Sequence, residues 1–335
     1  MMDIHSLLKT HYGISVASIQ KLTEGADLRA ERYIVTDDKG SQYFVKVRGN
    51  SNDLLSKDSH SGSQSTALLT KLADAKIPNI IPPLTALVPT PIITAYPFIE
   101  GKNGFDHSLT KPQWHQIGKT LRRIHDISSK QELTPYILNP YKPSLEFCNQ
   151  VDDILDQIES IKGFDATSEA YLKLIKTHQS TLIEMTSRFR KLWKTVDIES
   201  RDHVVCHADL HAGNILIDKK GQIYIIDWDD AILAPRERDL MFIGAGIGNV
   251  WNTPDNIKWF YEGYGDISLS HDLITYFRLN RIFEDITEYH HFFLNTKNIT
   301  TQQQQKHEWL RDYTLQFTPN GVIDIALIKV FIAID

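Results

Sequence analysis

The stretch Val205-Cys-His-Ala-Asp-Leu-His-Ala-Gly-Asn-Ile-Leu-Ile217, followed by Ile223-Tyr-Ile-Ile-Asp-Trp-Asp-Asp230, decides the fold expected of this 335-residue chain. Phosphoryl transfer from ATP requires a carboxylate that orients or deprotonates the acceptor hydroxyl, and oxygen ligands that hold Mg²⁺ against the phosphates. The catalytic loop of kinases has an aspartate and an asparagine at the spacing of Asp209 and Asn214. The order Asp209, Asn214, Asp227 therefore indicates a phosphoryl-transfer site, with Asp209 as candidate base and the other two as candidate Mg²⁺ ligands.

Two apolar runs in this stretch predict a β-hairpin. Ile215-Leu-Ile217 and Ile223-Tyr-Ile-Ile226 are joined by Asp218-Lys-Lys-Gly-Gln222, where the glycine can adopt unusual backbone angles. Such a hairpin would bring Asn214 and Asp227 side by side, so that both could bind one metal ion.

A zinc site is the alternative interpretation of the segment. His203, His207 and His211 recur every four residues and could line one face of a helix. Strand-forming residues flank the segment and a Gly-Asn pair interrupts it, so we do not expect a continuous helix there.

The first hundred residues predict a small, mainly β lobe. Val16 to Leu22, Arg32 to Thr36 and Gln42 to Val47 have the composition of strands. Lys46 lies in the last of these, and two interpretations remain open for that stretch: a lysine that binds the α- and β-phosphates of ATP, or a lysine that extends from an edge strand to solvent. The downstream motif favours the first.

Two parts of a kinase nucleotide site are weak in this sequence. Gly25 stands alone in the turn Glu24-Gly-Ala-Asp27, whereas a kinase glycine-rich loop carries several glycines. The helix expected over residues 63–74 has no glutamate in its first turns to orient Lys46. Asp58 or Gln64 can substitute for that glutamate, or the pair is absent.

The segment Pro91-Ile-Ile-Thr-Ala-Tyr-Pro-Phe-Ile-Glu-Gly101 suits a hinge between lobes. Backbone groups beyond the last strand could pair with the edge of an adenine there; the alternative is an ordinary strand exit. The residues that would flank the adenine are Tyr96, Pro97, Phe98 and Ile99.

Helical periodicity follows this segment to the end of the chain. The predicted helices cover residues 111–127, 145–161, 168–193, 257–264, 273–294 and 302–317. We therefore expect an α+β, bilobal, protein-kinase-like fold, with a nucleotide-binding lobe over residues 1–100 and a larger, mainly helical catalytic and substrate-binding lobe over residues 101–335.

Composition excludes several classes of protein. The formal net charge of −6 argues against a general nucleic-acid binder and suits a cationic substrate. Two cysteines, Cys148 and Cys206, imply no disulfide framework. The N-terminus lacks the pattern of a signal peptide, and the apolar stretch from Ile323 to Ile334 is interrupted by charges and too short to span a bilayer. A cytoplasmic location with no membrane partner is expected, and the oligomeric state stays open.

These motifs resemble the aminoglycoside phosphotransferase family, which includes choline-kinase-like and other small-molecule kinases. The resemblance is carried by His207-Ala-Asp-Leu-His-Ala-Gly-Asn214, Ile226-Asp-Trp-Asp229 and Ala234-Pro-Arg-Glu-Arg-Asp-Leu240. Flanking segments, such as Asn103-Gly-Phe105 and Phe260-Tyr-Glu-Gly-Tyr-Gly265, resemble the members that act on aminocyclitols. The resemblance implies ATP-dependent O-phosphorylation of an aminocyclitol antibiotic, with spectinomycin as the expected acceptor.

The same resemblance implies the roles of individual residues. Asp209 would be the catalytic base, Asn214 and Asp227 the Mg²⁺ ligands, and Lys46 the phosphate-binding lysine. Candidate contacts to a cationic acceptor are Asp229, Asp230, Trp251, Tyr264, Glu284, Asp285 and Glu288. For each of these a structural role is the alternative: core packing for the two aromatic residues and a solvated face for the acidic ones.

Two other functions remain compatible with the sequence. The motifs would also serve a kinase for choline, a sugar or an amino alcohol. The missing helix glutamate leaves room for a nucleotide-binding pseudokinase that acts by interaction, although all base and metal positions are filled.

Overall fold

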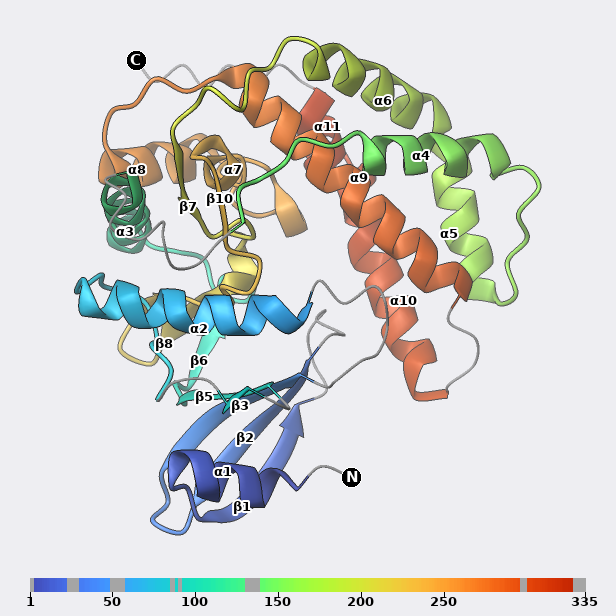
Figure 1. Cartoon of the computed structure of the whole chain (residues 1–335). Helices are drawn as coiled ribbons and strands as arrows, with labels where there is room; N and C mark the ends of the chain where they lie inside the picture. The colour runs from blue at the N-terminus through green and yellow to red at the C-terminus, as the bar shows by residue number, and fades with distance from the viewer. Residues whose placement is uncertain are drawn as a thin grey trace. The chain divides into compact units, whose positions relative to one another are not determined.

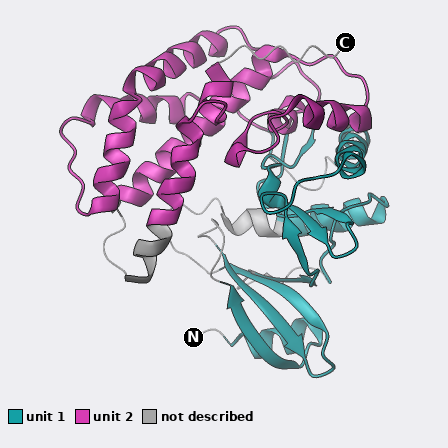
Figure 2. Cartoon of the chain, turned by 180° about the vertical axis from the view of Figure 1, so that it is seen from behind, with its two compact units in different colours: residues 1–140, 204–233 teal, residues 141–203, 234–335 magenta. Residues whose placement is uncertain are grey.

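The computed structural model describes residues 3–22, 30–48, 58–84, 88–89, 92–129, 139–295 and 300–327. The chain divides into two compact units, each described separately below (Figure 2). Unit 1 comprises Met1–Pro140 and Val204–Leu233, and unit 2 comprises Tyr141–His203 and Ala234–Asp335. The sequence boundary near residue 100 follows the two lobes of a kinase rather than these units, and it stays a prediction.

Unit 1 is built on a five-stranded antiparallel sheet with the strand order β1-β2-β3-β5-β4 (Figure 1). Its helices and strands are α1 (Ile4–Tyr12), β1 (Val16–Leu22), β2 (Glu31–Asp37), β3 (Gln42–Arg48), α2 (Asp58–Asp74), β4 (Val88–Pro89), β5 (Ile92–Pro97), β6 (Gly101–Asn103), α3 (Lys111–Ser129), η2 (Ala212–Asn214), β8 (Ile215–Asp218) and β9 (Ile223–Ile225). Two further strands, β7 (His203–Cys206) and β10 (Ile232–Pro235), pair with each other where the chain passes from one unit to the next.

One face of the five-stranded sheet forms a hydrophobic core with α1. Alternate residues of the central strands are buried together with Leu8 of the helix; they are Tyr33, Val35, Val45, Val47, Ile93 and Ala95. Because side chains alternate between the two faces of a strand, Lys46 and Arg48 of β3 project from the opposite face. The sequence pattern that places the valines in the core thus also presents two cations on the other side of the sheet.

The predicted hairpin is confirmed. β8 pairs antiparallel with β9, with Ile215 opposite Ile225 and Ile217 opposite Ile223. Gly221 has a φ of 81°, and the Asp218 carboxylate accepts hydrogen bonds from the backbone of Lys220 and Gln222. β6 adds a third strand on the other edge of β8.

Unit 2 is helical. Its elements are α4 (Glu146–Gln157), α5 (Ala166–Thr177), α6 (Gln179–Trp193), α7 (Glu237–Leu240), η3 (Ile247–Asn249), α8 (Pro254–Tyr264), α9 (His271–Asn295), α10 (Thr300–Thr314), η4 (Leu315–Phe317) and α11 (Val322–Leu327). The long helix α9 contacts α4, α5, α6, α7 and α11. The buried aromatic residues of α9, among them Tyr276, Phe277 and Phe283, fill this core.

The sequence prediction of one helix over residues 168–193 is wrong. The segment forms α5 and α6, which are separated at His178, where φ is −106° and ψ is 15°. No glycine or proline marks the break, so periodicity alone does not reveal it. Contacts of α5 with α10 and of α6 with α4 accompany the change of direction.

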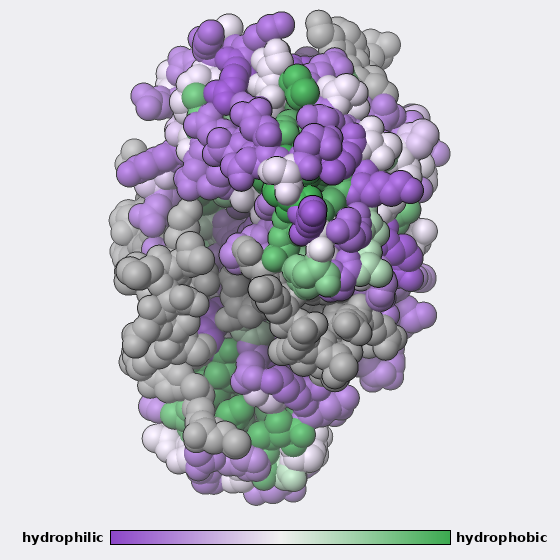
Figure 3. Space-filling view, turned by 90° about the vertical axis from the view of Figure 1, so that its right-hand side faces the viewer, coloured by the Kyte–Doolittle hydropathy of each residue, from purple (hydrophilic) through white to green (hydrophobic). Residues whose placement is uncertain are grey.

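The antiparallel sheet and the mainly helical remainder confirm the predicted α+β class. Among the described residues, no helix is both long and apolar enough to cross a membrane. Hydrophilic residues cover most of the described surface seen in Figure 3, and hydrophobic residues form smaller areas.

Candidate active site

The loop between β7 and β8 is held by a buried histidine. His207 is 0% exposed; its Nε2 donates to the Ile226 carbonyl at 2.8 Å, and its Nδ1 accepts the Asp209 N–H at 3.2 Å. Both hydrogen bonds are satisfied by the neutral ring with its proton on Nε2. Ala208, between the two residues, has a φ of 66°, a backbone conformation that a non-glycine residue adopts only when its surroundings impose it. His207 therefore fixes the loop at the position from which Asp209 projects.

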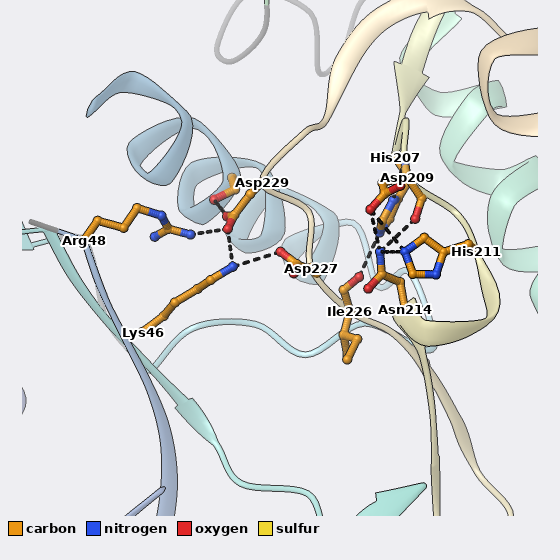
Figure 4. A network of polar contacts seen from close by, with 10 residues as sticks. Lys46, Arg48, His207, Asp209, His211, Asn214, Ile226, Asp227 and Asp229 are labelled. Atoms are coloured by element: carbon orange, nitrogen blue, oxygen red, sulfur yellow. Dashed lines mark hydrogen bonds and ion pairs between the residues drawn. The ribbon is translucent and has the colours of Figure 1, made fainter. Parts of the chain in front are cut away.

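Asp209 and Asn214 are in direct contact. The Asn214 side-chain amide donates to the Asp209 main-chain oxygen at 2.8 Å and to Asp209 Oδ2 at 3.1 Å. The main-chain carbonyl of Asn214 accepts a hydrogen bond from the Ile226 N–H at 3.0 Å, which ties the end of the loop to the chain leaving β9. Figure 4 shows this cluster together with the residues of β3.

His211 is a third member of the cluster, and the sequence motifs alone do not assign it a role in catalysis. Its Nδ1 accepts the Gly213 N–H at 3.0 Å, and its Nε2 lies 3.3 Å from Asp209 Oδ2 and 3.4 Å from the Asn214 side-chain nitrogen. The Phe105 ring stacks on His211, with centroids 5.6 Å apart. A Cβ at Gly213 would lie 2.7 Å from the His211 ring and 2.8 Å from Phe105, so this packing requires glycine.

This segment does not support a zinc site on a helix. β7 leads into a loop and the short η2, so His203, His207 and His211 do not share a helical face. His207 also has protein partners at both ring nitrogens.

Lys46 forms an ion pair with Asp227, the second candidate metal ligand. Its Nζ lies 3.0 Å from Asp227 Oδ1, and its side chain is 7% exposed against 37% for that of Asp227. Asp227 has a φ of 60°, so the chain turns sharply as it leaves the hairpin. Lys46, Asp209, Asn214 and Asp227 all belong to unit 1.

Asp229 lies in a network of buried charges. Lys46 and Arg48 both donate to Asp229 Oδ2 (Figure 4), and the Ser65 hydroxyl donates to Oδ1 at 3.0 Å. Burial acts to raise the pKa of Asp229, but the charges and hydrogen bonds of Lys46 and Arg48 outweigh it and hold the pKa well below its usual value. Burial likewise acts to lower the pKa of Arg48, and the Asp229 charge raises it overall.

Arg48 and Ser65 are absent from the sequence prediction. Arg48 follows Lys46 by two positions on a strand and so shares its face, a signal that was available in the sequence. Ser65 lies in α2 and carried no comparable signal.

The donor set of Asn214 and Asp227 fits Mg²⁺. The ion prefers carboxylate and amide oxygens, and both residues supply them. The Asn214 amide nitrogen faces Asp209, so its oxygen points away from that carboxylate. Bound there, the ion would neutralise phosphate charge.

The hinge candidates lie at the end of β5. Tyr96 pairs with Phe44 of β3 in register, and its ring is 6.2 Å from that of Phe44. Burial raises the pKa of Tyr96, which keeps the phenol neutral.

The Phe98 N–H donates to the Gln42 carbonyl at 3.2 Å, whereas Pro97 has no N–H. Ile99 is half-buried, and Gly25 lies outside the described residues.

The acceptor candidates outside unit 1 belong to unit 2. Trp251 and Tyr264 are 6% and 1% exposed, and Tyr264 stacks on Phe260. Both rings are thus buried, and their assignment to the acceptor stays a prediction.

The acidic candidates of unit 2 lie on α9. Asp285 forms an ion pair with Arg281 at 2.9 Å, Glu284 is half-buried and Glu288 is exposed. In unit 1, Asp230 is exposed beside the half-buried Asp229. The assignment of these residues to the acceptor remains a prediction.

The chain matches a known family over most of its length. The model of the phosphotransferase enzyme family matches residues 18–265. A crystal structure of spectinomycin phosphotransferase in complex with ADP and spectinomycin shares 35% sequence identity with the chain, covers 97% of both chains and superposes with a TM-score of 0.84. An AMP-bound structure of spectinomycin phosphotransferase shares 33% identity over 96% of both chains, with a TM-score of 0.80.

A choline kinase from Streptococcus pneumoniae shares the fold, with 15% identity, a TM-score of 0.54 and coverage of 94% of this chain and 98% of its own. A comparison with curated protein sequences found no match. The family match and the 35% identity over almost the whole chain confirm the bilobal kinase-like fold. The chain belongs to the phosphotransferase enzyme family, in which it resembles the kinases that phosphorylate hydroxyl groups of small molecules.

Proposed function

We propose that the chain is an ATP- and Mg²⁺-dependent O-phosphotransferase that phosphorylates a hydroxyl of an aminocyclitol or aminoglycoside antibiotic, with spectinomycin as the expected acceptor. The observation that carries this proposal is the arrangement of Lys46 against Asp227 beside the contact between Asp209 and Asn214. The 35% identity with a phosphotransferase that was crystallised with ADP and spectinomycin supports the choice of nucleotide and acceptor. The location that we propose is cytoplasmic.

Asp209 acts as the base in this proposal. Its carboxylate accepts the proton of the acceptor hydroxyl while the hydroxyl oxygen forms a bond to the γ-phosphorus and the bond from that phosphorus to the β,γ-bridging oxygen breaks, which releases ADP. Asn214 orients the carboxylate through Oδ2. General-base catalysis of this kind contributes about 10²- to 10⁴-fold to a rate.

The nucleotide is held mainly by unit 1. Lys46 binds the α- and β-phosphates, and Asn214 and Asp227 would hold Mg²⁺. Residues 96–99 flank the adenine, and Gly25 is a further candidate contact to the nucleotide. When bound, the ion would supply charge neutralisation at the phosphates, and Lys46 of β3 supplies an ammonium group with little exposure to water.

The acceptor is held by carboxylates. Asp230 lies next to the phosphoryl-transfer residues, and Glu284, Asp285 and Glu288 lie on α9. Glu284 and Glu288 are one helical turn apart, so both can meet ammonium groups of one ligand. Asp229, Trp251 and Tyr264 complete the predicted set.

A panel of acceptors tests the proposal. Purified chain is incubated with ATP, MgCl₂ and spectinomycin, several aminoglycosides, choline, ethanolamine or a sugar; ADP release and the mass of the acceptor are measured. We expect spectinomycin-dependent ADP release and the addition of one phosphoryl group to the drug, both abolished in Asp209→Asn. Phosphorylation of choline or a sugar alone would identify a metabolite kinase, and ATP binding without turnover on any acceptor would identify a pseudokinase.

A further inference from the structure

Three donors from two elements converge on the Asp229 carboxylate. Lys46 and Arg48 of β3 donate to Oδ2, and Ser65 of α2 donates to Oδ1 at 3.0 Å. The side chains of Lys46 and Arg48 are each 7% exposed, and that of Asp229 is 20% exposed. Both carboxylate oxygens of Asp229 are therefore bound by protein groups, which is the environment of a structural anchor.

The backbone explains why Asp229 can reach Lys46 together with Asp227. The left-handed conformation of Asp227 turns the chain, and Trp228 is buried at 2% exposure with its Nε1 donating to the Ile225 carbonyl at 3.0 Å. With Trp228 fixed in the core, the two flanking carboxylates both meet the Lys46 ammonium. Figure 4 shows Asp227 and Asp229 pointing to Lys46, with Arg48 extending beside Lys46 toward Asp229.

The two carboxylates, Asp227 and Asp229, have different environments and therefore different expected roles. Asp227 is the more exposed of the pair and is the one that the proposed function assigns to Mg²⁺. An ion at Asp227 would compete with Lys46 for that carboxylate. Asp229 is clamped by Arg48 and Ser65, so it can keep the lysine in place when Asp227 takes another partner.

Helix α2 contains no glutamate, although a helix glutamate is the usual partner of a kinase phosphate-binding lysine. We propose that Asp229 takes over this task as a positioning residue: held by Arg48 and Ser65, it fixes the Lys46 ammonium where the lysine meets the nucleotide phosphates. The inference rests on the proposed function, because it assumes that Lys46 binds ATP.

Ligands with and without phosphates test this role. Calorimetry measures the affinity for ADP and for adenosine of three variants, Asp229→Asn, Lys46→Met and Asp38→Asn. The last is the control, because it changes an exposed aspartate of the β2–β3 turn. We expect Asp229→Asn to weaken ADP binding about tenfold, the effect of losing one charged hydrogen bond, and to leave adenosine binding unchanged. The same variant should raise the KM for ATP, and Asp38→Asn should behave as the unchanged protein.

Relocating the carboxylate gives a second test that does not depend on the stability of one variant. Because Ser65 Oγ is 3.0 Å from Asp229 Oδ1, a glutamate at position 65 can place its carboxylate in the space that Asp229→Ala vacates. We expect Ser65→Glu with Asp229→Ala to bind ADP more tightly than Asp229→Ala alone. Ser65→Glu by itself should weaken ADP binding, because it adds a carboxylate beside Asp229.

The outcomes separate the inference from the proposed function. If Lys46→Met weakens ADP binding and Asp229→Asn does not, the positioning role is wrong and the function stands. Equal losses of ADP and adenosine affinity in Asp229→Asn, without rescue by the relocated glutamate, also overturn the role, because they indicate a general loss of structure. If Lys46→Met leaves ADP binding unchanged, the assignment of Lys46 in the proposed function fails.

Discussion

Asn214 binds Asp209 twice, through the main-chain oxygen at 2.8 Å and through carboxylate Oδ2 at 3.1 Å. The residue assigned to Mg²⁺ thus also sets the direction of the residue assigned as base. Orientation of the base and ligation of the metal are therefore coupled through one side chain.

Asn214→Asp tests this coupling. The variant keeps oxygen ligands for Mg²⁺ but replaces the amide donor by a carboxylate that repels Asp209, so the base loses both orientation and a favourable contact. We expect kcat to fall at least about tenfold, which corresponds to a loss of about 1.4 kcal/mol of transition-state stabilisation. The affinity for ADP should stay unchanged. Steady-state kinetics with the acceptor identified above provide the measurement. An unchanged kcat would show that the amide does not orient the base.

His211→Ala tests the second group that contacts the base. His211 Nε2 lies 3.3 Å from Asp209 Oδ2, and a close polar contact of this kind contributes up to about 1.5 kcal/mol. We expect kcat to fall roughly tenfold with the KM for ATP unchanged. His211→Gln, which retains a side-chain N–H, should recover part of the loss, and Phe105→Ala should cause a smaller loss because it removes only the ring stacked on His211. Equal activity of His211→Ala and the unchanged protein would exclude this role.

The motifs of the active site could be read from the sequence because their spacing is local. Asp209 and Asn214 share one loop, and the apolar runs on either side of Gly221 encode the hairpin that returns the chain toward Asn214. The valines that alternate with Lys46 encode a strand with one face in the core. Such patterns depend on two-residue periodicity and turn chemistry, which a single sequence displays.

The partners of Lys46 could not be predicted in the same way. Ser65, Lys46 and Asp229 are far apart in the chain, and their meeting depends on the packing of α2 and on the left-handed turn at Asp227. The break at His178 is of the same kind, because no glycine or proline stands there and tertiary contacts determine where the helix ends. Long-range packing of this type overrides local propensity.

Arg278 provides a test of stability in unit 2. Arg278 is 7% exposed, and its guanidinium donates to the Met241 and Ile243 carbonyls, each at 2.8 Å. Burial lowers its pKa to about 10, which still leaves the group charged at neutral pH. Arg278→Met should lower the free energy of unfolding by roughly 1–3 kcal/mol, because buried carbonyls lose their donors. Urea unfolding measures the change, with Arg311→Met at an exposed position as the control. A loss no larger than that of the control would contradict the prediction.

His290 predicts how the stability of the chain depends on pH. Burial, and to a lesser degree the neighbouring His291, lowers the pKa of His290 to about 4, against 6.5 for an unperturbed histidine. Between these two values the unfolded chain binds the proton more readily than the folded chain, so the contribution of His290 to stability is complete above pH 6.5 and is lost as the pH falls toward 4. Since the ring is only partly buried, we expect a loss on the order of 1–2 kcal/mol rather than the full linkage value. Urea unfolding of the unchanged protein and of His290→Gln at several pH values over this range measures the effect, with the exposed His5→Gln as control. The free energy of unfolding of His290→Gln should fall less between pH 6.5 and pH 4, by this amount, than that of the unchanged protein. The same pH dependence in all three proteins would show that His290 takes up its proton equally in the folded and unfolded chain.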